Sequence, residues 1–152
     1  MTFIGDGNNV ANSLILCGAL LGMEIRIACP KGFEPNSYFV NRAREIYGDK
    51  SLLKITNDPI NAVKGANVLY TDVLSSMGEE NQKEKKDRNF SGFTIDCNLL
   101  NKADKEAIVL HCLPAYRDKE ITDAVIESDK SRIFEQAENR LHAQQALLAC
   151  ML

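Results

Sequence analysis

The chain opens with Thr2-Phe3-Ile4-Gly5-Asp6-Gly7-Asn8-Asn9-Val10, in which a short apolar run meets a glycine-rich turn and the start of a helical pattern. Residues 2–4 predict a strand, and the apolar spacing of residues 10–21 predicts a helix that the two asparagines can cap. The same alternation of strand and helix continues along the chain. Such alternation is typical of a parallel sheet with helices on both faces. We therefore predict an α/β fold of three layers, α/β/α, around a mostly parallel, doubly wound, Rossmann-like sheet of about five strands.

The other elements follow from the same periodicities. Strands are predicted at residues 23–29, 52–55, 66–70 and 108–110, with a small extra strand at 93–95. Helices are predicted at residues 36–47, 59–64, 99–103, 119–127 and 135–152, and residues 78–88 are expected to form a polar helix or loop. The last helix carries an apolar stripe of Phe134, Ala137, Leu141 and Leu148. No internal repeat or linker interrupts the pattern, so residues 1–152 are predicted to form one domain.

Composition excludes several classes of function. The chain has 152 residues, of which 45% are hydrophobic and 26% charged, as in an ordinary globular protein. A net charge of -3 favours neither nucleic acid nor an anionic membrane as a partner. No apolar stretch reaches the roughly 20 residues of a membrane span. We expect no signal peptide, because the predicted first strand, Thr2-Phe3-Ile4, leads directly into a glycine turn. Because Met1 stands directly before that strand, we expect it to begin a domain excised from a longer protein.

Five cysteines and two histidines are present, and no Cys-x-x-Cys pair occurs among them. This usage does not predict a zinc site, and an odd cysteine count without a framework is typical of a reducing, cytoplasmic environment. Cys17, Cys29 and Cys150 have apolar neighbours and are predicted to be small core residues. Cys112 differs, because it lies between a histidine and a Leu-Pro turn.

Three predicted strands end in polar clusters: Gly5 to Asn9, Asp72 to Gly78, and His111-Cys112-Leu113-Pro114. In a doubly wound sheet, ligands bind outside the carboxyl ends of the strands where the strand order reverses. The first, fourth and last strands meet at that point, so we predict that the three clusters form one site. Each cluster also has a purely structural explanation, respectively helix capping, an Asx-turn, and packing at a strand end.

The first cluster does not match the dinucleotide-binding fingerprint. Its Gly-x-Gly lacks the third glycine or alanine, since position 10 is Val10, and no acidic residue ends the second strand to bind a ribose. Asn8 and Asn9 instead offer amide groups at a helix N-terminus, where a carboxylate is stabilised. An aspartate such as Asp72 can bind an ammonium group, and Ser76 with its loop backbone can add neutral hydrogen bonds. Gly78 would let that loop close as a lid.

Together these residues resemble the C-terminal, amino-acid-binding half of ornithine carbamoyltransferase over the full length of the chain. The matching stretches are Gly5-Asp6-Gly7-Asn8-Asn9, Thr71-Asp72-Val73 with Ser76-Met77-Gly78, His111-Cys112-Leu113-Pro114 and Gln136-Ala137-Glu138-Asn139-Arg140. Aspartate carbamoyltransferases lack both the Ser-Met-Gly and the His-Cys-Leu-Pro motifs. The resemblance implies transfer of a carbamoyl group from carbamoyl phosphate to the side-chain amine of L-ornithine, giving L-citrulline and phosphate in arginine biosynthesis. It also implies a homotrimer without metal or organic cofactor.

The resemblance assigns roles to particular positions. Asn9, Asp72, Ser76 and Met77 are implied to contact ornithine. Cys112 and Leu113 are implied to lie near the reacting amine and the carbamoyl group, with Arg140 polarising the carbamoyl oxygen, so that Cys112 and Arg140 are the candidate catalytic residues. His111 belongs to the motif without an assigned role.

Two departures from the family pattern matter. Leu74 stands where the family usually has tryptophan, and the chain contains no tryptophan. The Ser-x-Arg-Thr and His-Pro-x-Gln motifs of the carbamoyl-phosphate-binding half are absent from these 152 residues. We therefore expect the isolated chain to be inactive, and its final helix to lose part of its docking surface. Three alternatives stay open: a carbamoyltransferase for putrescine or an acylated ornithine, a non-catalytic amino-acid-binding module, and a dinucleotide-binding oxidoreductase domain.

Overall fold

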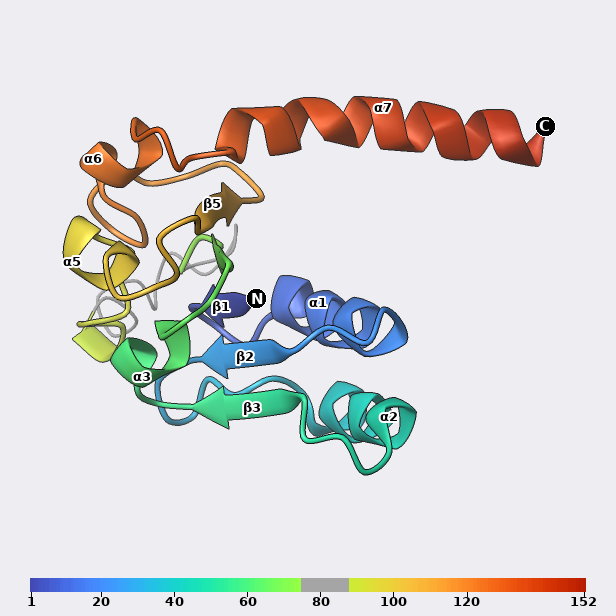
Figure 1. Ribbon diagram of the computed structural model, residues 1–152, viewed down its shortest axis with the longest axis horizontal. Helices are drawn as coiled ribbons and strands as arrows, with labels where there is room; N and C mark the ends of the chain where they lie inside the picture. The colour runs from blue at the N-terminus through green and yellow to red at the C-terminus, as the bar shows by residue number, and fades with distance from the viewer. Residues whose placement is uncertain (75–87) are drawn as a thin grey trace.

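Figure 1 shows the computed structural model of the chain, which describes residues 1–74 and 88–152. In these two ranges the strands form one parallel sheet of five strands, ordered β3-β2-β1-β4-β5. Its strands are β1 (Thr2–Ile4), β2 (Ile25–Ala28), β3 (Leu53–Thr56), β4 (Val68–Thr71) and β5 (Ile108–His111). The chain turns outward from β1 toward β3 and then crosses back to β4. The predicted doubly wound topology is therefore confirmed, with its switch point between β1 and β4.

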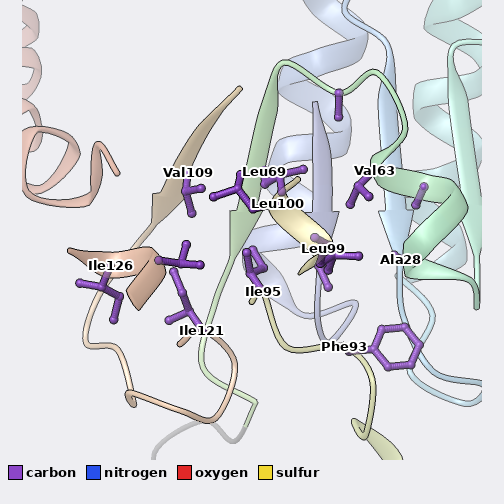
Figure 2. Close-up of a cluster of buried hydrophobic side chains, with 14 of the residues drawn as sticks. Ala28, Val63, Leu69, Phe93, Ile95, Leu99, Leu100, Val109, Ile121 and Ile126 are labelled. Carbon is purple, nitrogen blue, oxygen red and sulfur yellow. The ribbon is translucent and has the colours of Figure 1, made fainter. Parts of the chain in front are cut away.

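Helices cover both faces of the sheet (Figure 1). They are α1 (Asn9–Leu20), α2 (Ser37–Tyr47), α3 (Pro59–Val63), α5 (Cys97–Leu100), α6 (Asp123–Ile126) and α7 (Ile133–Met151). Neighbouring residues of one strand point to opposite faces. Phe3 accordingly packs with residues of α1 and α2, whereas Ile4 packs with residues of α3, α5 and α6. Figure 2 shows the second of these two cores, in which Leu69 and Val109 from the strands meet Leu99, Leu100 and Ile126 from the helices.

The turn between β1 and α1 is built on a close backbone approach. A Cβ atom at Gly7 would lie 2.3 Å from the nitrogen of Pro35 and 2.4 Å from the carbonyl carbon of Glu34. Gly7 also donates its N–H to the carbonyl of Phe33 at 2.8 Å. Only glycine fits between these two backbones, so the first loop is held against the segment that leads into α2.

The helix starts follow from capping side chains, as the sequence predicts. The side chain of Asn8 accepts hydrogen bonds from the N–H groups of Val10 and Ala11, at 3.0 and 3.2 Å. Asn36 and Asp58 cap α2 and α3 in the same way. The first helix therefore begins at Asn9, one residue after its cap.

Three predictions of secondary structure need correction. Residues 93–95 form no strand, and only an isolated bridge joins Ile95 to Ile121. The helix predicted at 99–103 spans Cys97–Leu100, because Asp96 caps it two residues earlier. The helix predicted at 119–127 shrinks to Asp123–Ile126, since Glu120 is directed inward and Ile121 belongs to the bridge. The polar element predicted at 78–88 lies almost wholly outside the described residues.

The last helix, α7, extends away from the rest of the domain (Figure 1). Its one buried residue is Ile133. The predicted apolar stripe is present in sequence but uncovered, because Phe134, Leu141 and Leu148 are 58%, 57% and 59% exposed. In the described chain, no other element therefore covers the apolar stripe of this helix.

Candidate active site at the carboxyl ends of the strands

The carboxyl ends of β1, β4 and β5 lie side by side. Ile4 pairs with Thr71, and Thr71 pairs in turn with His111. The side chain of Thr71 also donates a hydrogen bond to the carbonyl of Ile4 at 2.7 Å. The predicted convergence of the three strand ends is therefore confirmed, and it places the residues that follow each strand around one point.

Asp72 lies at that point and connects the three polar clusters. Its Oδ2 accepts a hydrogen bond from the Asn8 amide at 2.8 Å, and its Oδ1 accepts one from the Cys112 thiol at 2.8 Å. The N–H of Val73 donates to the same Oδ1 at 2.7 Å. Asp72 is 8% exposed, so its carboxylate is largely withdrawn from water, and the donors that it has among the described residues are neutral. A buried carboxylate with this environment can bind an ammonium group strongly.

The Cys112 thiol keeps its proton at neutral pH. Burial, together with the hydrogen bond to Asp72 and the charge of that carboxylate, raises its pKa to about 12, while the charge of Arg140 acts in the opposite direction. A thiol in this state donates a hydrogen bond and is not a nucleophile. The geometry therefore favours a role for Cys112 in orienting or polarising a ligand.

Behind Cys112, a buried polar network fixes the turn that follows β5. The Nδ1 of His111 accepts the N–H of Leu113 at 2.8 Å, so the proton of the neutral ring is on Nε2. That Nε2 faces Oε1 of Glu120 at 3.2 Å, and Oε1 also accepts the N–H of Tyr116 at 2.6 Å. Leu113 has a left-handed backbone, with a φ of 56°, and a cis peptide bond joins it to Pro114. His111 thus holds the turn in shape from inside the domain.

Sequence reasoning did not identify Glu120. Nothing in the pattern of residues 119–127 separates it from the other charged residues of a predicted helix. The one signal is its place nine residues after His111, within reach of a strand-end histidine. Gln136 belongs to one of the matching motifs but has no role assigned by sequence. In the structure its side chain makes two hydrogen bonds to the sheet, one with the N–H of His111 and one with the hydroxyl of Tyr70.

The predicted site residues are distributed unevenly. The structure joins Asp72 to Cys112, and Leu113 is half-buried beside them. Asn9 begins α1 with an exposed side chain, while Asn8 makes the contact to Asp72. Arg140 is exposed on α7. Ser76 and Met77, like Gly78, lie outside the described residues.

Leu74, at the position where the family usually has tryptophan, is 9% exposed. It packs in the same core as Phe90 and Phe93. The leucine is therefore an internal packing residue at the point where the described part of this loop ends.

Within residues 1–74 and 88–152, no group of three or more histidine, cysteine or acidic side chains is arranged to hold a metal ion. In the same ranges, no helix has both the length and the apolar character needed to cross a membrane.

The fold and the site define a class of protein. A family model described as the aspartate/ornithine carbamoyltransferase Asp/Orn binding domain matches residues 1–151, and the chain belongs to this family. It is 76% identical over 152 residues to the ornithine carbamoyltransferase of Prochlorococcus marinus subsp. pastoris. The matched region covers 100% of this chain and 49% of that relative. The chain thus spans about half the length of the curated relatives it matches.

Solved structures agree with this placement. The ornithine carbamoyltransferase from Pyrococcus furiosus matches 97% of this chain and 48% of its own, with a TM-score of 0.91 and 42% identity. The ornithine carbamoyltransferase from Gloeobacter violaceus matches 97% of this chain and 49% of its own, with a TM-score of 0.84 and 49% identity.

Proposed function

We propose that residues 1–152 are the ornithine-binding domain of an ornithine carbamoyltransferase, and that a separate carbamoyl-phosphate-binding domain completes the enzyme. The observation that carries the proposal is the arrangement around Asp72, where Asn8 and Cys112 from two other strand ends bind the same carboxylate. This is the point of the fold at which a small amino acid would be bound. The longer protein would transfer a carbamoyl group from carbamoyl phosphate to L-ornithine.

Physical chemistry decides which end of ornithine faces Asp72. An alkyl ammonium has a pKa of about 10.4, so releasing its proton at pH 7 costs roughly 4.6 kcal/mol. Only the neutral amine can attack the carbamoyl carbon, and a carboxylate beside that amine would hold its proton. Asp72 therefore binds the α-ammonium, which can stay charged throughout the reaction. Asn9, Ser76 and Met77 complete the ornithine contacts, and the N-terminus of α1 favours the α-carboxylate.

The side-chain amine lies beside Cys112, whose thiol is neutral and polarisable. Cys112 and Leu113 border the carbamoyl group, and Arg140 stabilises the charge that develops on its oxygen. No metal or organic cofactor takes part in this scheme. By family resemblance, we further propose that the longer protein is a cytoplasmic homotrimer.

A different acceptor is the main alternative. Putrescine keeps an ammonium group on the corresponding carbon but lacks the carboxylate, and an acylated ornithine lacks the positive charge at the α-nitrogen. Among the described residues, the donors to the buried carboxylate of Asp72 are neutral, which favours a free α-ammonium over an acylated nitrogen. The N-terminus of α1 favours the α-carboxylate that putrescine lacks. A non-catalytic amino-acid-binding module would bind ornithine in the same way without supporting turnover.

Calorimetric titration with L-ornithine tests the proposal, first on this chain and then after adding a separately expressed carbamoyl-phosphate-binding half together with carbamoyl phosphate. Putrescine and acetylornithine are titrated in parallel, and Asp72→Asn is the control variant. We expect citrulline to form only in the mixture containing ornithine. Turnover with putrescine or acetylornithine in preference to ornithine would overturn the choice of substrate. Binding of ornithine without any turnover in the mixture would overturn the assignment as an enzyme.

A further inference from the structure

The open edge of β5 is closed by the segment that leads into α7. β5 is the last strand of the sheet, so alternate backbone groups along its outer side need partners. The N–H of Val109 donates to the carbonyl of Lys130 at 2.9 Å, and the N–H of Arg132 donates to the carbonyl of Val109 at 2.9 Å. This pairing is a parallel bridge between Val109 and Ser131. It stops there, because the chain then turns into α7.

The next outward N–H of β5 after Val109 belongs to His111, and a side chain, that of Gln136, supplies the acceptor that a neighbouring strand would otherwise provide. Two residues beyond Val109, the N–H of His111 donates to Oε1 of Gln136 at 3.1 Å. This bond fixes the orientation of the side-chain amide, since a backbone N–H can only donate. The amide nitrogen of Gln136 must then face the hydroxyl of Tyr70, and it donates to that oxygen at 2.8 Å. One side chain therefore ties α7 to β5 and β4 at once.

Few other contacts among the described residues hold α7 in place. Ile133 is its one buried residue, and the helix beyond it is exposed or half-buried. The pairing at Arg132 fixes where the helix begins, while Gln136, one turn later, fixes the direction of its axis. Arg140 lies one further turn along, about 12 Å from Arg132. A tilt of about 10° around the beginning of α7 would move Arg140 by about 2 Å.

We propose that Gln136 is a positioning residue, whose amide sets the place of Arg140 relative to Cys112 and Asp72. The catalytic consequence rests on the proposed function, because it takes Arg140 as the group that stabilises the carbamoyl oxygen. An error of about 1 Å in the position of such a group can cost on the order of a hundredfold in rate. The position of Arg140 in the free chain does not depend on the substrate, so it can be measured without ornithine.

The test measures the local charge at Cys112 with two alkylating reagents of similar reactivity, neutral iodoacetamide and anionic iodoacetate. Trypsin releases Cys112 as the sole cysteine of the peptide from Glu106 to Arg117, so its alkylation can be followed by mass spectrometry apart from the other four thiols. The ratio of the two rates cancels the thiolate fraction and the local opening, which affect both reagents equally. The ratio is the iodoacetate rate divided by the iodoacetamide rate, and a nearby guanidinium raises it by attracting the anionic iodoacetate.

We expect Arg140→Gln to lower this ratio about twofold at low ionic strength, and salt to suppress the difference. In a Gln136→Leu background, Arg140→Gln should have almost no further effect, because the guanidinium is no longer held near the thiol. In a Gln136→Glu background the twofold effect should return, since a carboxylate can accept from both His111 and the Tyr70 hydroxyl. Gln144→Leu, a matched change on the exposed part of α7, should leave the ratio unchanged.

A twofold effect of Arg140→Gln that persists in the Gln136→Leu background overturns the proposal, as does the absence of any effect in the parent chain. Thermal unfolding verifies that each variant is folded. If Gln136→Leu does not fold, Tyr70→Phe takes its place, because it removes one of the two amide bonds and should reduce the effect of Arg140→Gln. None of these rates depends on ornithine binding or turnover, so failure here is distinct from failure of the proposed function.

Discussion

The Sγ of Cys112 donates a hydrogen bond to Oδ1 of Asp72 over 2.8 Å, although the two residues are forty positions apart in the chain. The thiol and the carboxylate each limit the chemistry of the other. Burial and the carboxylate together keep the thiol protonated, and the thiol occupies one of the lone pairs that a bound ammonium would use. Ligand binding at Asp72 must therefore compete with Cys112 or share the carboxylate with it.

Replacing each partner of this pair should have a different kinetic effect in the longer, active protein. Asp72→Asn removes the charge that binds the α-ammonium, and we expect it mainly to raise the KM for ornithine, on the order of a hundredfold. Cys112→Ala leaves that charge intact and should mainly lower kcat. Steady-state kinetics with varied ornithine separate the two parameters. Equal and small effects of both changes would contradict the assigned roles.

The reactivity of Cys112 should depend on Asp72. Because burial, the hydrogen bond to Asp72 and its charge raise the thiol pKa to about 12, alkylation of Cys112 in the parent chain should be slow at pH 8 and should keep rising with pH until about 12. Asp72→Asn removes the charge and should shift this profile to lower pH. Cys150, like Cys17, is exposed, so the prediction that these two thiols are core residues is wrong, and Cys150 provides an internal control for reagent reactivity. A Cys112 profile that does not change in Asp72→Asn would show that the carboxylate has no influence on the thiol.

Alkaline pH should weaken the fold through two thiols. The folded-state pKa values of Cys29 and Cys112 are both raised to about 12, mainly by burial. A raised pKa stabilises the fold below the unfolded value, near 9, and this stabilisation is lost as pH rises from there toward 12. At pH 10 each thiol should cost up to about 1.4 kcal/mol. Urea unfolding at pH 8 and pH 10 measures the loss, which should be smaller in Cys112→Ser, since serine does not titrate in this range.

Removing the buried acceptor of the His111 network should destabilise the domain. Glu120→Leu leaves the Tyr116 N–H bond and the ring N–H of His111 without their shared acceptor, and we expect a loss of about 3 kcal/mol. Glu120→Gln retains an acceptor oxygen and should cost about 1 kcal/mol. Urea unfolding distinguishes the two variants. Similar stabilities for both would show that the network contributes little beyond packing.

The first loop should tolerate no side chain at Gly7. Gly7→Ala places a methyl group within 2.4 Å of two backbone atoms of residues 34 and 35, and should cost about 2–3 kcal/mol through overpacking. Gly22→Ala is a suitable control, because a Cβ there meets nothing within 4 Å and is disfavoured only by a φ of +66°. The control should cost about 1 kcal/mol. A Gly7→Ala variant as stable as the control would show that the loop can move away from residues 34 and 35.

Much of the fold follows from sequence, since buried parallel strands read as short apolar runs and their carboxyl ends carry the polar residues. This is why β1, β4 and β5, and the meeting of their ends, could be predicted. The ends of helices could not be predicted where a side chain binds a residue that is distant in the sequence. Glu120 lies in a segment that has helical spacing, and its burial depends on His111, which only the tertiary fold brings near.

The site illustrates the same limit. Cys112 and Asp72 could be singled out because a thiol and a carboxylate at strand ends are unusual. The choice between Asn8 and Asn9 could not be made from sequence, because it depends on which residue stands just outside the first turn of α1. The structure gives the Asp72 contact to Asn8, the residue that caps the helix. The part of Asn9 in ornithine binding stays a prediction.

Asn8 has two partners at once: its Oδ1 receives the N–H groups of Val10 and Ala11, and its amide nitrogen is bound to Asp72. A ligand that binds the carboxylate of Asp72 and displaces it will therefore also alter the hydrogen bonds in the first turn of α1. The chemical shifts of these two amide protons should change when the site is occupied, so NMR could detect an unlabelled ligand.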